Sequence, residues 1–169
     1  RRARISPVEG IFTHYPLGEQ SERGTGRFGD EARRLGEIFA RATGDSLVLL
    51  NESLSSTSAG ESLYLAQDLV RILRLMGTRA VFATHLHELA ANAEALNAGT
   101  AGDSRVVSMV SSPIREEALG EEVQAVPRSY KVTVGPPMGR SYATEIATRF
   151  GVSYEQLYAM LHARGIVTG

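Results

Sequence analysis

Cysteine is absent from this chain of 169 residues. Its absence excludes disulfide bonds and thiolate metal sites, and it fits a cytoplasmic protein. No apolar run reaches membrane-spanning length, so we expect no membrane partner. The basic start, residues 1–5, is not followed by an apolar stretch and therefore lacks the pattern of a signal peptide. It is more typical of a cut made inside a larger protein.

A strong excess of charge of one sign is also missing. The formal net charge is −1, so no global field attracts nucleic acid, and any DNA contact would come from a local patch or from elsewhere. The length and the ordinary apolar and charged fractions predict a globular protein with a sizeable core. Because no repeat or low-complexity block interrupts it, we expect a single domain over residues 1–169.

The chain has no phosphate-binding loop that ends in Gly-Lys-Ser/Thr. Its one glycine cluster, Gly24–Gly29, lacks the lysine and does not follow a strand. The spacing of these glycines is also wrong for a dinucleotide-binding fingerprint. Whatever nucleotide chemistry the chain supports, it holds only half of a site.

Two short apolar runs that end in polar residues are present. Residues 46–50 lead into Asn51-Glu52, and residues 79–83 lead into Thr84-His85. Such runs are typical of buried parallel strands, whose carboxyl ends border ligand sites. A carboxylate there can orient a water, and an imidazole can donate a hydrogen bond to a γ-phosphate oxygen. The pair indicates a phosphoanhydride-cleaving site, although polar residues also follow the strands of any α/β domain, where the chain surfaces.

The predicted fold is α/β, with a largely parallel sheet flanked by helices and an antiparallel β addition. A capping box at Ser58–Glu61 predicts the start of a helix that Gly77 stops. Ser153–Gln156 forms another such box. The other expected elements are a strand in 8–15, a loop over 17–30, helices at 31–43, 85–95, 141–150 and 153–163, and strands at 105–110 and 129–134.

The block from Leu47 to Ala90 resembles the MutS-type DNA mismatch-repair ATPases, a branch of the ABC/SMC-like P-loop NTPases. In that family a strand ends in Asp-Glu, a small-residue loop with Gly-Thr-Ser and a helix follow, and the next strand ends in Phe-Ala-Thr-His with Glu-Leu soon after. In register with this pattern stand Ser56-Thr57-Ser58, Phe82-Ala83-Thr84-His85 and Glu88-Leu89. Weaker similarity at 10–13 and 139–151 extends the match over nearly the whole chain.

The resemblance implies a role for each matching residue. Glu52 would be the catalytic glutamate, Asn51 would hold Mg²⁺ through a water, and His85 would be the switch histidine. The residues implied at the nucleotide and dimer interface are Ser55, Ser56, Thr57 and Ser58 of the loop, with Gly26 and Arg27 of the signature stretch 24–31. A structural alternative is that these small loop residues only allow close packing of helix and strand.

The same resemblance implies ATP and Mg²⁺ as cofactors, both requiring a phosphate loop upstream of this segment. We therefore expect the C-terminal portion of a MutS-like ATPase domain, a fragment of a longer protein that homodimerises and contacts mismatched or branched double-stranded DNA through other domains. The parent would be an ATPase, and the isolated fragment would be inactive.

Two substitutions depart from the family pattern. Asn51 replaces an aspartate, and Gly26-Arg27 replaces Ser-Thr. They leave two alternatives open: a non-catalytic dimerisation module, or a MutS relative acting on recombination or branched DNA.

Overall fold

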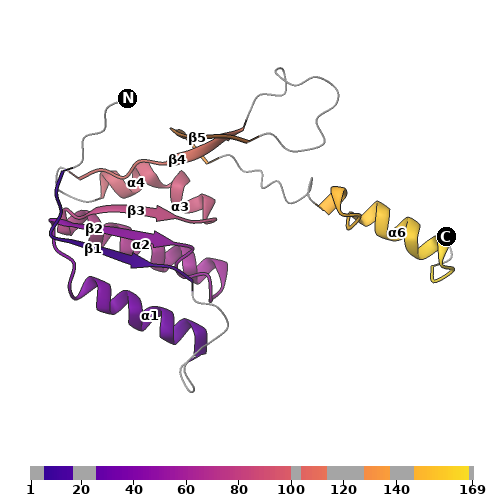
Figure 1. The fold of residues 1–169 in the computed structure, drawn as a ribbon, viewed down its shortest axis with the longest axis horizontal. Coiled ribbons are helices and arrows are strands. Elements are labelled where there is room, and N and C mark those ends of the chain that lie inside the picture. Colours follow the sequence, from indigo (N-terminus) through magenta and orange to yellow (C-terminus); the bar gives the residue numbers. More distant parts are fainter. Residues whose placement is uncertain (1–5, 17–25, 100–103, 114–127, 138–146, 168–169) are drawn as a thin grey trace. The chain divides into compact units, whose positions relative to one another are not determined.

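The computed structural model divides the chain into two compact units, residues 1–109 with 134–137 and residues 110–133 with 138–169. It describes residues 6–16, 26–99, 104–113, 128–137 and 147–167 (Figure 1). The predicted α/β fold is confirmed. The prediction of a single domain stays a prediction.

The first unit contains a three-stranded parallel sheet in the order β1-β2-β3. Its strands are β1 (Gly10–His14), β2 (Ser46–Asn51) and β3 (Arg79–Ala83). The last two match the apolar runs 46–50 and 79–83, and β1 lies within the strand expected in 8–15. The register aligns His14 with Leu50 and Asn51 with Ala83. All three strands therefore deliver the residues that follow them to one edge of the sheet.

Helix α1 (Gly26–Phe39) joins β1 to β2, and α2 (Ala59–Met76) joins β2 to β3. The boundaries of α2 follow from local signals. The Ser58 hydroxyl accepts the Glu61 N–H at the first turn. At the other end Gly77 has φ +69°, and the N–H groups of Gly77 and Thr78 bond back to carbonyls of the last turn.

Three predicted elements have other bounds in the structure. Helix α1 spans Gly26–Phe39 rather than residues 31–43. It starts earlier because Asp30 and Glu31 are buried and extend the packed part of the helix beyond its apolar positions. The helix predicted over 85–95 is two helices, α3 (His87–Ala91) and α4 (Ala93–Ala98), which meet at Asn92, a residue of lower helix propensity.

The third error concerns β4, which spans Met109–Pro113 rather than residues 105–110. The side chain of Asn97 bonds both the N–H and the carbonyl of Val106, at 2.8 and 2.9 Å. Because these backbone groups are taken by a side chain, no strand forms around Val106.

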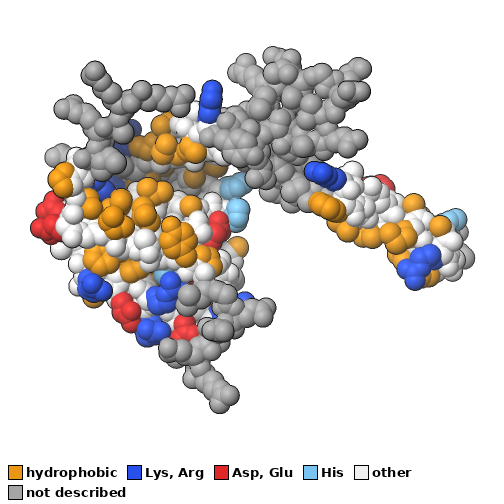
Figure 2. Space-filling model, viewed as in Figure 1, with side chains coloured by type: hydrophobic (Ala, Val, Ile, Leu, Met, Phe, Trp, Pro, Cys, Tyr) orange, Lys and Arg blue, Asp and Glu red, His pale blue; other side chains and the backbone are white. Residues whose placement is uncertain are grey.

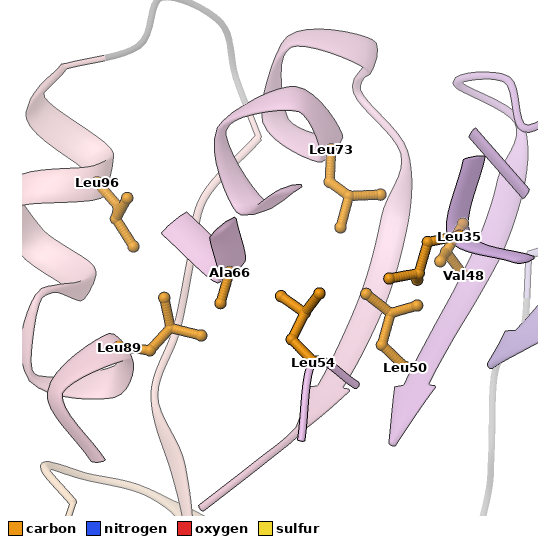
Figure 3. Packing of buried hydrophobic residues seen from close by; sticks show 8 residues of the cluster. All are labelled: Leu35, Val48, Leu50, Leu54, Ala66, Leu73, Leu89 and Leu96. Atoms are coloured by element: carbon orange, nitrogen blue, oxygen red, sulfur yellow. The ribbon is translucent and has the colours of Figure 1, made fainter. Parts of the chain in front are cut away.

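The core lies between the helices and one face of the sheet. Val48 and Leu50 of β2 point into it and are almost completely buried. The rest of the cluster comes from α1, α2, α3, α4 and the loop after β2 (Figure 3): Leu35, Leu54, Ala66, Leu73, Leu89 and Leu96. Leu54 belongs to this cluster although it lies in the loop beyond the end of β2, so the core fixes that loop as well.

The opposite face of the sheet is open to solvent in this unit. Ile11 and Val81 are 62% and 58% exposed there, beside the partly buried Leu47 and Leu49. Hydrophobic side chains gather over the strands in Figure 2. Parallel sheets are usually covered on both faces, so this apolar face is unusual.

The second unit contains most of a small antiparallel sheet, formed by β4 and β5 (Arg128–Val134), and the helix α6 (Tyr154–Ala163). Ser153 and Gln156 form the predicted capping box of α6. The helix predicted over 141–150 lies mostly outside the described residues. None of the helices in the described ranges is long and apolar enough to span a membrane.

The two faces of the sheet provide a stability prediction with a matched control. Val48 is fully buried, whereas Val81, of the same residue type on the neighbouring strand, is mostly exposed. We expect Val48→Ala to lower the free energy of unfolding by about 2 kcal/mol, since it removes two buried carbon atoms and leaves a cavity. Val81→Ala should cost below about 1 kcal/mol. Urea denaturation measures both, and equal losses would contradict the assignment of the core face.

Candidate active site at the strand ends

Glu52 and His85 meet at the edge of the sheet. The Glu52 N–H donates to the Ala83 carbonyl at 2.8 Å and so continues the pairing of β2 with β3 by one residue. His85 lies two residues after β3, and its Nε2 is 3.3 Å from the Glu52 Oε1. The His85 side chain is 90% exposed and that of Glu52 31%. The structure thus brings together the two residues expected to be catalytic, while their catalytic roles stay predictions.

The backbone beyond β2 is strained. Glu52 and Leu54 have φ values of +48° and +68°, in the left-handed region. A residue with a Cβ atom loses roughly 1 to 2 kcal/mol in that conformation. Such strain persists only where surrounding contacts fix the chain, and it is common at functional sites.

The contacts that fix this loop come from three different elements. From α1, the buried Glu31 carboxylate accepts the Leu54 N–H at 2.6 Å and also accepts the Ser56 hydroxyl. From α2, the Ser62 hydroxyl donates to the Leu54 carbonyl at 2.5 Å. From β1, Nδ1 of His14 lies 2.7 Å from the Ser53 hydroxyl oxygen.

His14 is a buried imidazole in this network. Burial lowers its pKa, the nearby Arg34 charge lowers it further, and Glu31 acts in the opposite direction. The ring is therefore neutral near pH 7. Its Nε2 is buried without a hydrogen-bond partner in the described part of the chain.

Three of the four loop hydroxyls predicted at a dimer interface bond within the chain. Ser56 donates to Glu31, and Thr57 and Ser58 donate to Glu61 at 2.6 and 2.8 Å. These two hydroxyls hold the pKa of Glu61 below its usual range. Ser55 is exposed. The role of this loop at an interface and the alternative of close helix–strand packing both stay predictions.

Gly26 and Arg27 form the start of α1. Gly26 has φ +69°, a conformation that glycine adopts at no steric cost. Arg27 is exposed. The residues just before them in the signature stretch, 24 and 25, lie outside the described part of the chain, so the predicted contact with a nucleotide of the partner stays a prediction.

The donor set at the strand ends suits Mg²⁺ only in part. The described residues contain no group of three or more His, Cys, Asp or Glu side chains that could hold a metal ion. Asn51 and Glu52 supply one amide and one carboxylate. Mg²⁺ usually keeps several waters and binds one or two carboxylates together with substrate phosphates. The residues present therefore fit a magnesium ion that a nucleotide and water mainly coordinate.

The sequence interpretation missed His14, Ser53 and the packing role of Glu31. One available signal was position, since His14 ends a parallel strand just as Asn51 does. For Glu31 the available signal was its place in the sequence, a carboxylate directly before the first apolar residue of the helical pattern in α1. Neither pattern specifies a partner, because the contacts join residues at least 23 positions apart.

Comparison with known proteins identifies a family for this sequence. A family model described as MutS domain V matches residues 1–157. The DNA mismatch repair protein MutS of Sorangium cellulosum is 33% identical over 153 residues, which are 90% of this chain and 15% of that protein. Endonuclease MutS2 of Thermus thermophilus is 32% identical over 130 residues, which are 77% of this chain and 15% of that protein.

The chain thus spans only about 15% of the length of these relatives. The residues that the family model matches include β1, α1, α2, Glu52 and His85. The family match includes 157 of the 169 residues. The chain therefore belongs to the MutS domain V family.

Proposed function

We propose that this chain is the C-terminal portion of the ATPase domain of a MutS-like protein. The parent protein would hydrolyse ATP as a homodimer and couple turnover to conformational change on mismatched double-stranded DNA. The observation that carries the proposal is the meeting of Glu52 and His85, 3.3 Å apart, beyond two neighbouring parallel strands. Ligands of open α/β sheets bind at such edges.

In the proposed mechanism Glu52 orients and deprotonates the attacking water. His85 donates a hydrogen bond to an oxygen of the γ-phosphate, and its exposure leaves it accessible to a nucleotide. Asn51 would hold Mg²⁺ through a water, and the ion would neutralise charge on the β- and γ-phosphates. An upstream phosphate loop would supply most of the N–H donors that cradle the phosphates.

Two further observations support a longer parent protein. The relatives extend far beyond the matched region. The open face of the sheet carries Ile11 and Val81, which a complete parallel sheet would cover. Because the net charge is −1, the DNA contacts of the parent would come from other domains. A repair role on DNA fits the cytoplasmic location expected from the lack of cysteine.

Two other functions remain candidates, each for a specific reason. The amide of Asn51 carries no charge where the family has a carboxylate, which favours a non-catalytic dimerisation module. An endonuclease MutS2 is 32% identical over 77% of this chain, and a DNA mismatch repair protein MutS is 33% identical over 90% of it. Similarity of this degree to both kinds of relative supports, as a second candidate, a MutS relative that acts on recombination or branched DNA.

The first prediction concerns Glu52 in the full-length parent. Glu52→Gln should lower ATP turnover on the order of a hundredfold or more, the usual scale for loss of a general base, and trap an ATP-bound dimer. Steady-state hydrolysis and nucleotide-binding assays measure the two effects. Glu94→Gln, at an exposed position of α4, is the matched control and should keep wild-type turnover. Unchanged hydrolysis by Glu52→Gln would show that Glu52 is not the base.

The second prediction concerns the metal side. Asn51→Asp places a carboxylate beside the proposed magnesium and should therefore lower the Mg²⁺ concentration needed for half-maximal hydrolysis. A magnesium titration of ATPase activity in the parent and the variant tests this. A parent without activity that Asn51→Asp fails to restore would favour the dimerisation module.

The third prediction concerns the 169-residue chain by itself. Without a phosphate loop it lacks most of the backbone donors for the β- and γ-phosphates, so we expect no measurable turnover and weak or no ATP binding. Isothermal titration calorimetry is the direct measurement. Micromolar affinity for ATP would mean that the phosphate cradle lies within this chain.

A further inference from the structure

Two backbone N–H groups on either side of Ser53 are anchored in the loop that carries Glu52. On one side the Glu52 N–H bonds to the Ala83 carbonyl of β3. On the other side the Leu54 N–H bonds to the Glu31 carboxylate of α1. Only Ser53 lies between these anchored residues, and the left-handed conformations fall on Glu52 and Leu54 themselves. A segment this short has little freedom, so its two anchors determine its backbone.

We propose that Glu31 is a positioning residue for Glu52, acting through its hydrogen bonds to the loop Glu52–Ser58. The proposal rests on the proposed ATPase function, in which Glu52 acts on water. Glu31 does not touch the reacting atoms. It holds Leu54 and Ser56, and through them it fixes the direction in which the Glu52 carboxylate leaves the sheet toward His85.

A buried carboxylate suits this task because it accepts two donors at once. Its two oxygens receive the Leu54 N–H and the Ser56 hydroxyl separately. Bonds to an ionised acceptor are shorter and stronger than neutral ones. Without Glu31, the buried Leu54 N–H would lose its hydrogen-bond partner. Fewer contacts would then hold Glu52 and Leu54 in their left-handed conformations, and the loop could relax. Ser62 and His14 hold the same loop but contact other groups, the Leu54 carbonyl and the Ser53 hydroxyl.

Glu31 lies on the same helix as the residues implied to face a partner's nucleotide. Helix α1 begins at Gly26 and Arg27, the residues implied to face the nucleotide of a partner subunit. Glu31 is about one and a half turns further along the same helix. If α1 moves, Glu31 moves with it, and its hydrogen bonds to Leu54 and Ser56 transmit the movement to the loop.

The test compares three variants of the full-length parent. Glu31→Ala removes both bonds and should lower kcat for ATP on the order of tenfold or more, because misplaced catalytic groups react slowly, while KM changes less than about twofold. Glu31→Gln should keep most of the activity, because its carboxamide can accept from Leu54 and donate to Ser56. Glu37→Ala, at an exposed position on the same helix, is the control and should behave as wild type.

Amide hydrogen exchange on the 169-residue chain separates this proposal from the ATPase proposal. Glu31→Ala should accelerate exchange at Leu54 by about tenfold or more and leave Val48 in β2 unchanged. If that variant does not fold, Ser56→Ala, which removes only one bond, should still accelerate exchange at Leu54. If the full-length parent has no ATPase activity, that result contradicts only the ATPase proposal. The exchange rate at Leu54 then still tests whether Glu31 positions the loop.

Three results would overturn the proposal. The first is a kcat of Glu31→Ala within about twofold of wild type in an active parent. The second is Leu54 exchange that neither Glu31→Ala nor Ser56→Ala accelerates. The third is a loss in Glu31→Gln as large as in Glu31→Ala, which would assign the effect to the charge of Glu31 rather than to its two hydrogen bonds.

Discussion

The pairing of β2 with a parallel strand on each side is the constraint on which the first unit depends. It fixes which residues of β2 face the helices, and those residues, Val48 and Leu50, are almost completely buried in the core. The same register sets Asn51 opposite Ala83. The chain therefore has to leave the sheet at Glu52, next to the exit of β3. One pairing pattern thus determines both the core and the geometry of the candidate site.

Tertiary contacts, rather than local backbone preferences, determine the conformation of the loop beyond β2. Its backbone adopts left-handed conformations at two residues that have side chains, a local cost that no propensity favours. The cost is offset by burial of Leu54 in the core and by buried polar contacts from α1, α2 and β1. Disagreement between local preference and tertiary structure is expected at functional sites. Here it falls at the residue that the proposed chemistry needs.

Much of the fold could be predicted because its signals are local. Short apolar runs located β2 and β3, and Ser58 and Gly77 located the ends of α2. The start of α1 and the position of β4 could not be predicted, because they depend on contacts made by Glu31 and Asn97 with residues distant in the chain or outside regular elements. The site divides in the same way. The Glu52–His85 pair follows from strand order, whereas the His14–Ser53 contact joins residues 39 positions apart and has no sequence pattern.

The strand ends carry little negative charge for a magnesium site, and the proposed mechanism has to account for this. With an amide at Asn51, the end of β2 carries one carboxylate, and that carboxylate lies beside His85. In the proposed mechanism Glu52 must remain available to water, so it cannot also serve as the principal magnesium ligand. The ion would then be held mainly by the phosphates of the nucleotide and by water. Under the same proposal an upstream loop would hold these phosphates, so metal binding at Asn51 would depend on nucleotide binding. In the proposed mechanism the uncharged amide of Asn51 would thus couple metal binding to nucleotide binding, because a site with one available carboxylate attracts a divalent ion weakly without the phosphates.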